Sequence, residues 1–394
     1  MPKVIISPFD YLCRRFSLDE IKRATADFHE NLIIGRGGFG NVYRGLIDEG
    51  STTVAIKHLH PESKQGYREF LSEIETVSQL RCVHIVSLIG YCYDDNEMIL
   101  VYDYIANGTL RDQLYGTDNA PLPWKQRLQI CVGAARGLHY LHTGAKHPII
   151  HRDIKTTNIL LDEKWVAKIC DFGLSKQILD NTAASYVVEG TRGFSNAVDL
   201  EESGVSTRVM GTWGYLDPEY ARRQRLTETS DVYSFGAVLW EVLCARKPID
   251  TKLADEQRHL NHWARKCLER GIIGEIIDPC LKGTIAPESF KIYVEVAEGC
   301  ARDSGIQRPT MNDVLEKLDF ALELQKNADA ENEKTNPDYE RSYPELLSFH
   351  FAGSSGSAAE DASAHTRHMS ESDYSGSIYT SHDTITGDFS GRSS

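Results

Sequence analysis

Two short polar motifs constrain this chain more than any other part of its sequence. Residues 151–158 read His-Arg-Asp-Ile-Lys-Thr-Thr-Asn, and an Asp-Phe-Gly tripeptide occupies 171–173. In this arrangement Asp153 can accept the proton of a substrate hydroxyl, while Asn158 and Asp171 can hold Mg²⁺ ions against nucleotide phosphates. Either motif alone is weak evidence. Their order and spacing together predict a site for phosphoryl transfer from ATP.

A glycine-rich segment with the pattern G-x-G-x-x-G-x-V lies upstream. Its residues with an expected nucleotide role are Gly35, Arg36, Gly37, Gly38, Phe39, Gly40 and Val42. A dinucleotide-binding turn uses the same glycines, but there they join a strand to a helix, and an acidic residue follows about 20 residues later. Here the glycines lie between two β-like runs, 31–34 and 42–46, and Lys57 stands near the expected acidic position. Because glycine lacks a Cβ, such a hairpin can lay backbone N–H groups over phosphates, and we favour this interpretation.

Lys57 ends a β-like run and is expected to need a carboxylate partner, because an ammonium group in a cleft is costly unless it is paired. Apolar residues recur at helical spacing over 66–80. This periodicity places Glu73 on the apolar face, whereas Glu75 falls nearer to solvent. We therefore predict an ion pair between Lys57 and Glu73.

The motifs together resemble those of protein kinases, and most of the chain, Phe16–Gln325, is similar to one family. It resembles the intracellular kinase domain of plant receptor-like kinases, in particular the FERONIA-like group and the cytoplasmic Pto kinase. The strings that carry this resemblance are Phe-Ser-Leu-Asp-Glu-Ile-Lys at 16–22, Val-Ser-Leu-Ile-Gly-Tyr-Cys at 86–92, Gly-Ala-Ala-Arg-Gly-Leu-His-Tyr-Leu-His at 133–142 and Tyr-Leu-Asp-Pro-Glu-Tyr at 215–220.

The resemblance implies an α+β, bilobal fold with a β-rich N-lobe and a mainly helical C-lobe. It also implies a plant serine/threonine kinase in receptor signalling, and Lys155, two residues after Asp153, matches the Ser/Thr class and should contact the γ-phosphate. The cofactors expected from the resemblance are ATP and Mg²⁺. Further residues expected to line the ATP site are Ala55, the gatekeeper Tyr102, the hinge residues Asp103 and Ile105, and Leu160.

Arg152, beside the catalytic aspartate, indicates control through the activation segment, since an arginine there attracts an anion that phosphorylation can supply. Ser206 and Thr207 are the expected phosphorylation sites. The segment contains an acidic insertion at about 179–204, in which residues 201 and 202 are both Glu. These carboxylates are expected to substitute partly for a phosphate.

Three further contacts are expected around the site. They are Thr212 with Asp153 and Lys155, Glu219 with Arg308, and Asp231 with the backbone of the catalytic loop. The Glu219 pair is expected to be largely buried, so loss of one partner would leave the other charge unpaired.

The predicted organisation has four parts. They are an N-terminal extension with a capping-box helix at 1–27, an N-lobe at 28–102, a hinge and C-lobe at 103–326 with an extended activation segment at 171–219, and a tail at 327–394. The tail is rich in Ser and Gly and is expected to be disordered, because it cannot bury enough apolar surface to offset chain entropy.

Composition narrows the possible partners. The formal net charge is −14, which argues against nucleic acid. There is no run of about 18 or more apolar residues, so no transmembrane segment is expected. The nine cysteines lack CxxC spacing, which indicates neither a zinc site nor a disulfide framework. These features favour a cytoplasmic protein, at the inner membrane face through receptor partners. It would be either a cytoplasmic relative or a truncated receptor.

A rival interpretation is a pseudokinase or scaffold that binds ATP and recruits partners. Such proteins usually lack the ATP-binding lysine, the catalytic aspartate or the metal-binding aspartate. Lys57, Asp153 and Asp171 are all present, so an active enzyme acting on protein serines and threonines is favoured.

Overall fold

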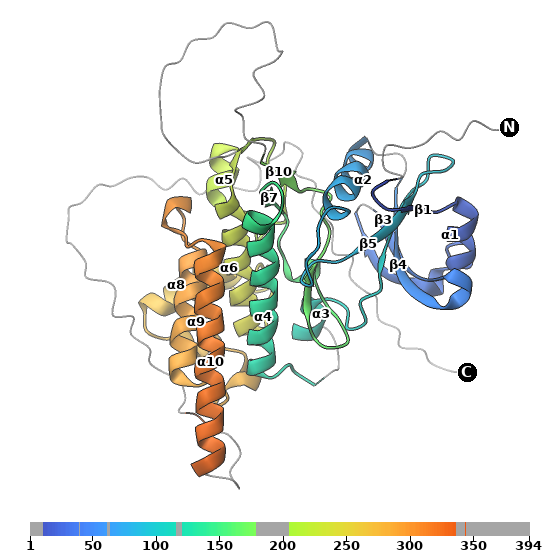
Figure 1. Ribbon diagram of the computed structural model, residues 1–394. Coiled ribbons are helices and arrows are strands. Elements are labelled where there is room, and N and C mark those ends of the chain that lie inside the picture. The colour runs from blue at the N-terminus through green and yellow to red at the C-terminus, as the bar shows by residue number, and fades with distance from the viewer. Residues whose placement is uncertain are drawn as a thin grey trace, which may run out of the picture. The chain divides into compact units, whose positions relative to one another are not determined.

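The computed structural model describes residues 11–38, 40–60, 64–115, 120–178, 205–335 and 343. These residues divide into two compact units (Figure 1). The first, here called the N-lobe, contains the described residues up to 79 and 87–104. The second, the C-lobe, contains 80–86 and the described residues from 105 to 343. The N-lobe is built around a sheet and the C-lobe mainly from helices, so the expected α+β class is confirmed.

The N-lobe sheet has six strands in the order β1-β5-β6-β4-β3-β2. The strands are β1 (Arg14–Arg15), β2 (Ile33–Gly37), β3 (Gly40–Ile47), β4 (Thr52–Leu59), β5 (Leu88–Cys92) and β6 (Met98–Asp103). Strand β1 runs parallel to β5, and the other neighbours are antiparallel. The central strands β4 and β6 carry Lys57 and Tyr102.

The capping box predicted at Ser17 is present. The Ser17 N–H donates to Glu20 Oε2 at 2.8 Å, and the Glu20 N–H donates to Ser17 Oγ at 3.3 Å. Helix α1 (Leu18–Ala24) begins there but ends before the predicted limit of Asp27, because residues 26–28 have positive φ values of 47–57°.

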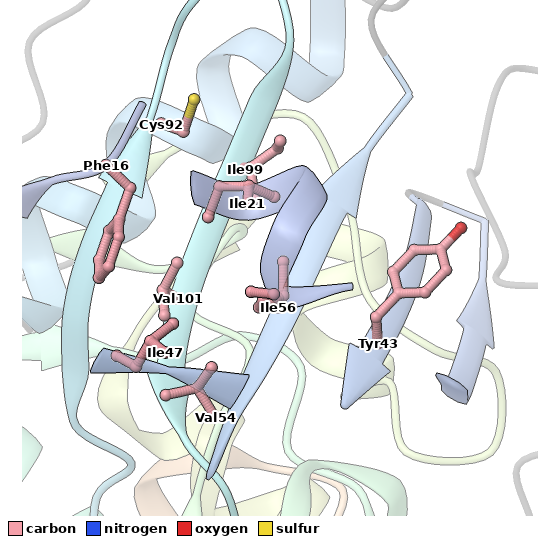
Figure 2. Close-up of a cluster of buried hydrophobic side chains, with 10 residues drawn as sticks. Phe16, Ile21, Tyr43, Ile47, Val54, Ile56, Cys92, Ile99 and Val101 are labelled. Carbon is pink, nitrogen blue, oxygen red and sulfur yellow. The ribbon is translucent and has the colours of Figure 1, made fainter. Parts of the chain in front are cut away.

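Residues 14–24 are part of the N-lobe rather than a separate extension. Phe16 and Ile21 are fully buried and share one hydrophobic cluster with residues of β3, β4 and β6 (Figure 2). Figure 2 shows Ile21 of α1 beside Ile99 of β6. Burying a large apolar side chain contributes about 1.5–3 kcal/mol, so these two residues fix α1 to the sheet.

Helix α2 (Lys64–Val77) presents the apolar face predicted from its periodicity. Phe70, Ile74 and Val77 are buried, and so is Glu73 on the same side. Glu75 is exposed, as expected.

The C-lobe is formed mainly by helices. These are α3 (Leu110–Leu114), α4 (Trp124–His139), α5 (Pro218–Arg223), α6 (Glu228–Cys244), α7 (Asp255–Arg258), α8 (Leu260–Glu269), α9 (Pro287–Cys300) and α10 (Met311–Thr335). Helix α10 lies beside α9 and α4, and α9 also contacts α6 (Figure 1). The long apolar run in α6 is buried over most of its length, so this helix forms part of the core of the C-lobe.

Short strand pairs in the C-lobe bracket the polar motifs. They are β7 (Ile149–Ile150) with β10 (Lys176–Gln177), β8 (Ile159–Leu161) with β9 (Ala167–Ile169), and β11 (Val205–Ser206) with β12 (Arg225–Leu226). Residues 80–86 belong to this lobe because the Val86 N–H donates to the Ile169 carbonyl at 2.9 Å.

Helix α10 continues past the predicted tail boundary at 326. Asp329 is buried and accepts hydrogen bonds from Gln325 Nε2 at 2.9 Å and from the Tyr343 hydroxyl at 3.0 Å. The predicted tail therefore begins with helical residues that pack on the C-lobe. The insertion at 179–204 and residues 344–394 lie outside the described residues. Within the described ranges, no helix is both long and apolar enough to span a bilayer.

Candidate active site

The catalytic loop is fixed by a carboxylate from α6. Asp231 is completely buried, and its two oxygens accept the N–H groups of His151 and Arg152 at 2.8 Å each. His142 Nε2 lies 3.0 Å from the same carboxylate. Arg152 has a positive φ of 76°, a costly conformation for a non-glycine residue that persists only where the surroundings enforce it. The contact expected for Asp231 is therefore present.

The Asp153 side chain is held from three directions. Its Oδ1 accepts a hydrogen bond from Thr212 Oγ1 at 2.6 Å, and its Oδ2 lies 2.7 Å from Lys155 Nζ. Asn158 Nδ2 donates to the same Oδ2 at 3.3 Å and to the Asp153 backbone carbonyl at 2.8 Å. Lys155 also donates to Thr212 Oγ1 at 3.0 Å. The contacts expected for Thr212 are both present, and they fix the position of the Asp153 carboxylate.

Electrostatics keep Lys155 charged in this cluster. Burial lowers the pKa of Lys155, but the charges of Asp153 and Asp171 together outweigh it, and the pKa is raised overall. A cation beside the Asp153 carboxylate is suited to bind a phosphate group, which carries negative charge.

The Asp-Phe-Gly loop follows the β8–β9 hairpin directly. The hairpin register pairs Ile159 with Ile169, and the Cys170 N–H donates to the Asn158 carbonyl at 3.0 Å. Asn158 is thus brought close to the residue that precedes Asp171. Asp171 has a positive φ of 68°.

Asn158 and Asp171 suit a divalent cation of the hard, oxygen-seeking type. Asn158 Nδ2 is committed to Asp153, which leaves the amide oxygen as the ligand atom, and Asp171 offers a carboxylate. In the described ranges, no three His, Cys, Asp or Glu side chains form a metal cage. Mg²⁺ is typically held by one or two protein groups with phosphates and water completing its shell, so the residues present fit such an ion.

The ion pair expected in the N-lobe is present. Lys57 Nζ lies 2.9 Å from Glu73 Oε2, and Glu73 is only 1% exposed. The other oxygen of Glu73, Oε1, accepts a hydrogen bond from the Tyr102 hydroxyl. This second contact was not predicted from the sequence. It holds the carboxylate from two strands, because Lys57 lies on β4 and Tyr102 on β6.

The glycine-rich segment forms the β2–β3 hairpin, with Gly35 opposite Val42 and Gly37 opposite Gly40. A side chain at Gly40 is excluded, since φ is +152° and a Cβ there would lie 2.0 Å from the His58 carbonyl oxygen. Glycine is therefore required at this position of the hairpin.

The remaining nucleotide candidates are distributed over both lobes. Arg36 is on β2, Gly38 in the turn, Ala55 on β4, Tyr102 and Asp103 on β6, Ile105 just after the N-lobe, and Leu160 on β8, while Phe39 lies outside the described residues. Ala55 and Tyr102 are register partners across β4 and β6.

The predicted pair between Glu219 and Arg308 is wrong. Arg308 instead makes a bidentate pair with Asp217, at 2.7 and 2.8 Å. Asp217 is the N-cap of α5 and faces Arg308, whereas Glu219 lies in the first helical turn, where it pairs with Arg223 at 2.9 Å and accepts the Gly305 N–H. An aspartate at a position where many kinases carry alanine was the signal for this role.

The expected regulatory residues lie close together. Arg152 Nη2 donates to Thr207 Oγ1 at 3.2 Å and also to the Arg208 carbonyl. Ser206 is on β11 opposite Arg225, and its side chain lies outside the described residues. The Tyr220 hydroxyl also contacts Arg152, at 3.0 Å from Nε, and sequence reasoning gave this tyrosine no role.

The two-lobed fold and these motif geometries define a protein kinase domain. The profile of the family described as protein tyrosine and serine/threonine kinase matches residues 28–318. The chain belongs to this family, whose members use ATP and a divalent metal ion to phosphorylate protein hydroxyl groups.

Several curated relatives from Arabidopsis thaliana are similar to the chain. The receptor-like protein kinase FERONIA is 58% identical over 318 residues, which cover 81% of this chain and 33% of FERONIA. The receptor-like protein kinases ANXUR2 and ANXUR1 are 56% and 55% identical over 324 residues, which cover 82% of this chain and 35% and 36% of those proteins. The chain thus spans about a third of the length of these relatives.

Proposed function

We propose that the chain is a Mg²⁺- and ATP-dependent serine/threonine kinase that acts in plant receptor-kinase signalling. The observation that carries this proposal is the arrangement around Asp153. Its carboxylate is held by Thr212 and Lys155, and it lies in the same loop as Asn158, which shares the C-lobe with Asp171. A base, a phosphate-binding cation and two metal ligands are thereby provided by one structural unit.

Each residue then has a separate task in the transfer. The oxygen of the serine or threonine hydroxyl bonds to the γ-phosphorus, and Asp153 accepts the proton of that hydroxyl. The bond between the γ-phosphorus and the bridging oxygen of ADP breaks, and ADP leaves with its electrons. Lys155 stabilises the γ-phosphate, and Lys57, oriented by Glu73, binds the α- and β-phosphates. Mg²⁺, when bound through Asn158 and Asp171, neutralises phosphate charge.

The remaining nucleotide contacts come from the hairpin and the strands. The exposed glycines Gly37 and Gly38 present backbone N–H groups to the phosphates, and the backbone of Asp103 to Ile105 binds adenine. Leu160 and Ala55 pack against the base. These assignments are supported by the family membership and by the positions of the residues on β2, β4, β6 and β8.

Serine and threonine specificity is supported by Lys155, two residues after Asp153. The curated relatives are receptor-like kinases, so we infer that the partners are receptor or membrane complexes and that the protein works at the cytoplasmic face of the plasma membrane. All nine cysteines lie in the described ranges and are free thiols, as suits a reducing compartment.

Control through the activation segment completes the proposal. Phosphorylation of Thr207, and of Ser206 beside it, would supply the anion for Arg152, whose Nη2 already lies 3.2 Å from Thr207 Oγ1. Phosphosite mass spectrometry after incubation with Mg-ATP tests this step. Modification found only in the C-terminal tail would count against it.

The enzymatic assignment is tested with Lys57→Met and Asp171→Asn. Each variant is expected to lose autophosphorylation and to remain folded. The thermal melt of Asp171→Asn should stay close to that of wild type, whereas Lys57→Met should melt at a lower temperature because it leaves the buried Glu73 without its cation. Retained activity would remove the role assigned to that residue. A wild-type protein that binds ATP without turning it over would instead be a scaffold.

A further inference from the structure

The Tyr220 hydroxyl, on helix α5, is the centre of a hydrogen-bond cluster. Arg152 donates to it from Nε at 3.0 Å and from Nη2 at 2.5 Å. The Met210 N–H donates to the same oxygen at 3.3 Å, and the hydroxyl itself donates to the Arg208 carbonyl at 2.9 Å. One side chain thus ties two residues of the activation segment to the catalytic loop.

The Tyr220 side chain is buried in the C-lobe, which holds its hydroxyl in place. It is 2% exposed and packs with Ile150 and Leu226 in a small hydrophobic cluster. Burial raises the pKa of the Tyr220 phenol, and Arg152 opposes the shift only in part. The hydroxyl is therefore neutral, and its single hydrogen and its lone pairs are all engaged.

The contacts of Tyr220 occupy the edge of Arg152 that an anion prefers. Nε and Nη2 lie along one side of the guanidinium group, where carboxylates and phosphates form bidentate pairs. Thr207 Oγ1 is already 3.2 Å from Nη2. A phosphate at Thr207 would carry a charge of about −1.5 to −2, so it is a stronger acceptor than a neutral phenol and competes for the same donors.

We propose that Tyr220 is a positioning residue that holds residues 207–210 against Arg152 in the unphosphorylated kinase, and that a phosphate on Thr207 takes over this task. The proposal rests on the regulation through Thr207 proposed above. It gives the enzyme a basal activity that does not depend on phosphorylation.

Tyr220 can influence phosphoryl transfer indirectly, through Thr212. This residue follows Met210 by two positions and donates to Asp153 Oδ1 at 2.6 Å. If residues 207–210 loosen, Thr212 is no longer delivered to the same place. Removal of the Tyr220 hydroxyl should therefore lower catalysis without any direct contact between Tyr220 and the reacting atoms.

The test compares Tyr220→Phe with a matched control, Tyr293→Phe. Tyr293 is also buried, and its hydroxyl donates to the Leu239 carbonyl at 2.8 Å, away from the activation segment. Both changes are made in a Ser206→Ala, Thr207→Ala background, which keeps these two sites unphosphorylated. Rates are measured with Mg-ATP and a degenerate peptide mixture that contains serine and threonine, and thermal melts confirm folding.

In this background Tyr220→Phe should lower kcat by about tenfold, the effect of about 1.4 kcal/mol of lost positioning, whereas Tyr293→Phe should leave kcat unchanged. Hydrogen exchange of the peptide that spans 207–212 should speed up only in Tyr220→Phe. Equal kcat for the two variants, or unchanged exchange of this peptide, would overturn the proposal.

A second comparison uses proteins with native Ser206 and Thr207, phosphorylated at Thr207 as verified by mass spectrometry. The Tyr220→Phe defect should then shrink to about twofold or less, because the phosphate holds Arg152 itself. A defect of the same size with and without phosphate would assign Tyr220 a purely structural role. Failure of the proposed function is separate, because it would appear as absent phosphoryl transfer in wild type.

Discussion

The catalytic loop and the activation segment meet at Arg152 but are held by different chemistry. The loop backbone is fixed by Asp231, a completely buried carboxylate that accepts two N–H groups at 2.8 Å. The described part of the activation segment next to Arg152 is fixed by the neutral hydroxyl of Tyr220 and by the guanidinium group of Arg152.

The difference follows from what each region must do. Hydrogen bonds to an ionised group are roughly twice as strong as those between neutral groups. Both regions contain such bonds, but the charge lies on different sides of them. In the loop it lies on the buried acceptor Asp231, whereas in the segment it lies on the donor Arg152, whose acceptors on Tyr220 and Arg208 are neutral oxygens. In the proposed regulation, a phosphate can replace these neutral acceptors. Phosphorylation would then change the partners of Arg152 in the segment, while the contacts of Asp231 with the loop backbone stay in place.

The largest effect on stability is expected for Asp231→Ala. It leaves the N–H groups of His151 and Arg152 without their buried acceptor, and such a loss should lower the free energy of unfolding by about 3–5 kcal/mol. Urea denaturation measures this change. Asp319→Asn, which breaks an exposed pair with Arg136, is the control and should cost less than about 1 kcal/mol. Similar losses of unfolding free energy for the two variants would show that Asp231 does not fix the loop more strongly than an exposed ion pair would.

A second, somewhat smaller effect is expected at the end of the activation segment. Asp217→Asn should lower the free energy of unfolding by about 2–4 kcal/mol, because it leaves buried Arg308 without its bidentate partner. Glu219→Gln is the matched control and should cost about 1 kcal/mol or less, since its partner Arg223 is exposed. A larger loss of unfolding free energy for Glu219→Gln than for Asp217→Asn would favour the Glu219–Arg308 pair predicted from the sequence.

The smallest effect concerns Glu241, a second buried carboxylate of α6. It accepts the hydroxyls of Tyr115, Thr156 and Tyr215, yet burial raises its pKa to about 7. The folded protein therefore keeps a proton here that the unfolded chain loses at lower pH. The stability from this group is complete below the unfolded pKa and is lost as pH rises to about 7.

Glu241→Gln should remove this pH dependence. Between about pH 4.5 and 7, the free energy of unfolding of wild type should fall by about 1–3 kcal/mol more than that of the variant. Denaturation midpoints across this range provide the measurement. Parallel curves for the two proteins would show that Glu241 does not titrate between folded and unfolded states.

The sequence predicted the fold and much of the site because the relevant signals are local. The helical periodicity around Glu73 identified the partner of Lys57, and the capping box at Ser17 located the start of α1. The end of α1 was missed because it depends on three consecutive residues with positive φ, none of them glycine.

The parts that could not be predicted depend on contacts between distant segments. Asp217 and Arg308 are 91 positions apart, and the choice between Asp217 and Glu219 is set by the orientation of α5. Tyr220 has the sequence context of an ordinary core residue, and its hydroxyl gains a role only through Arg152, 68 positions earlier. Helix α10 extends beyond its apolar periodicity because buried polar contacts at Asp329 replace apolar packing.

The central claim is that Asp153 is the base for transfer of the γ-phosphoryl group to serine or threonine. The most direct test is the initial rate of peptide phosphorylation with Mg-ATP for Asp153→Asn and wild type, with Asp319→Asn as a control that leaves the site intact. If Asp153 is the base, kcat of Asp153→Asn should fall by at least about 10²-fold, while the variant remains folded and still binds ATP. A rate within about twofold of wild type would contradict the assignment of Asp153 as the base.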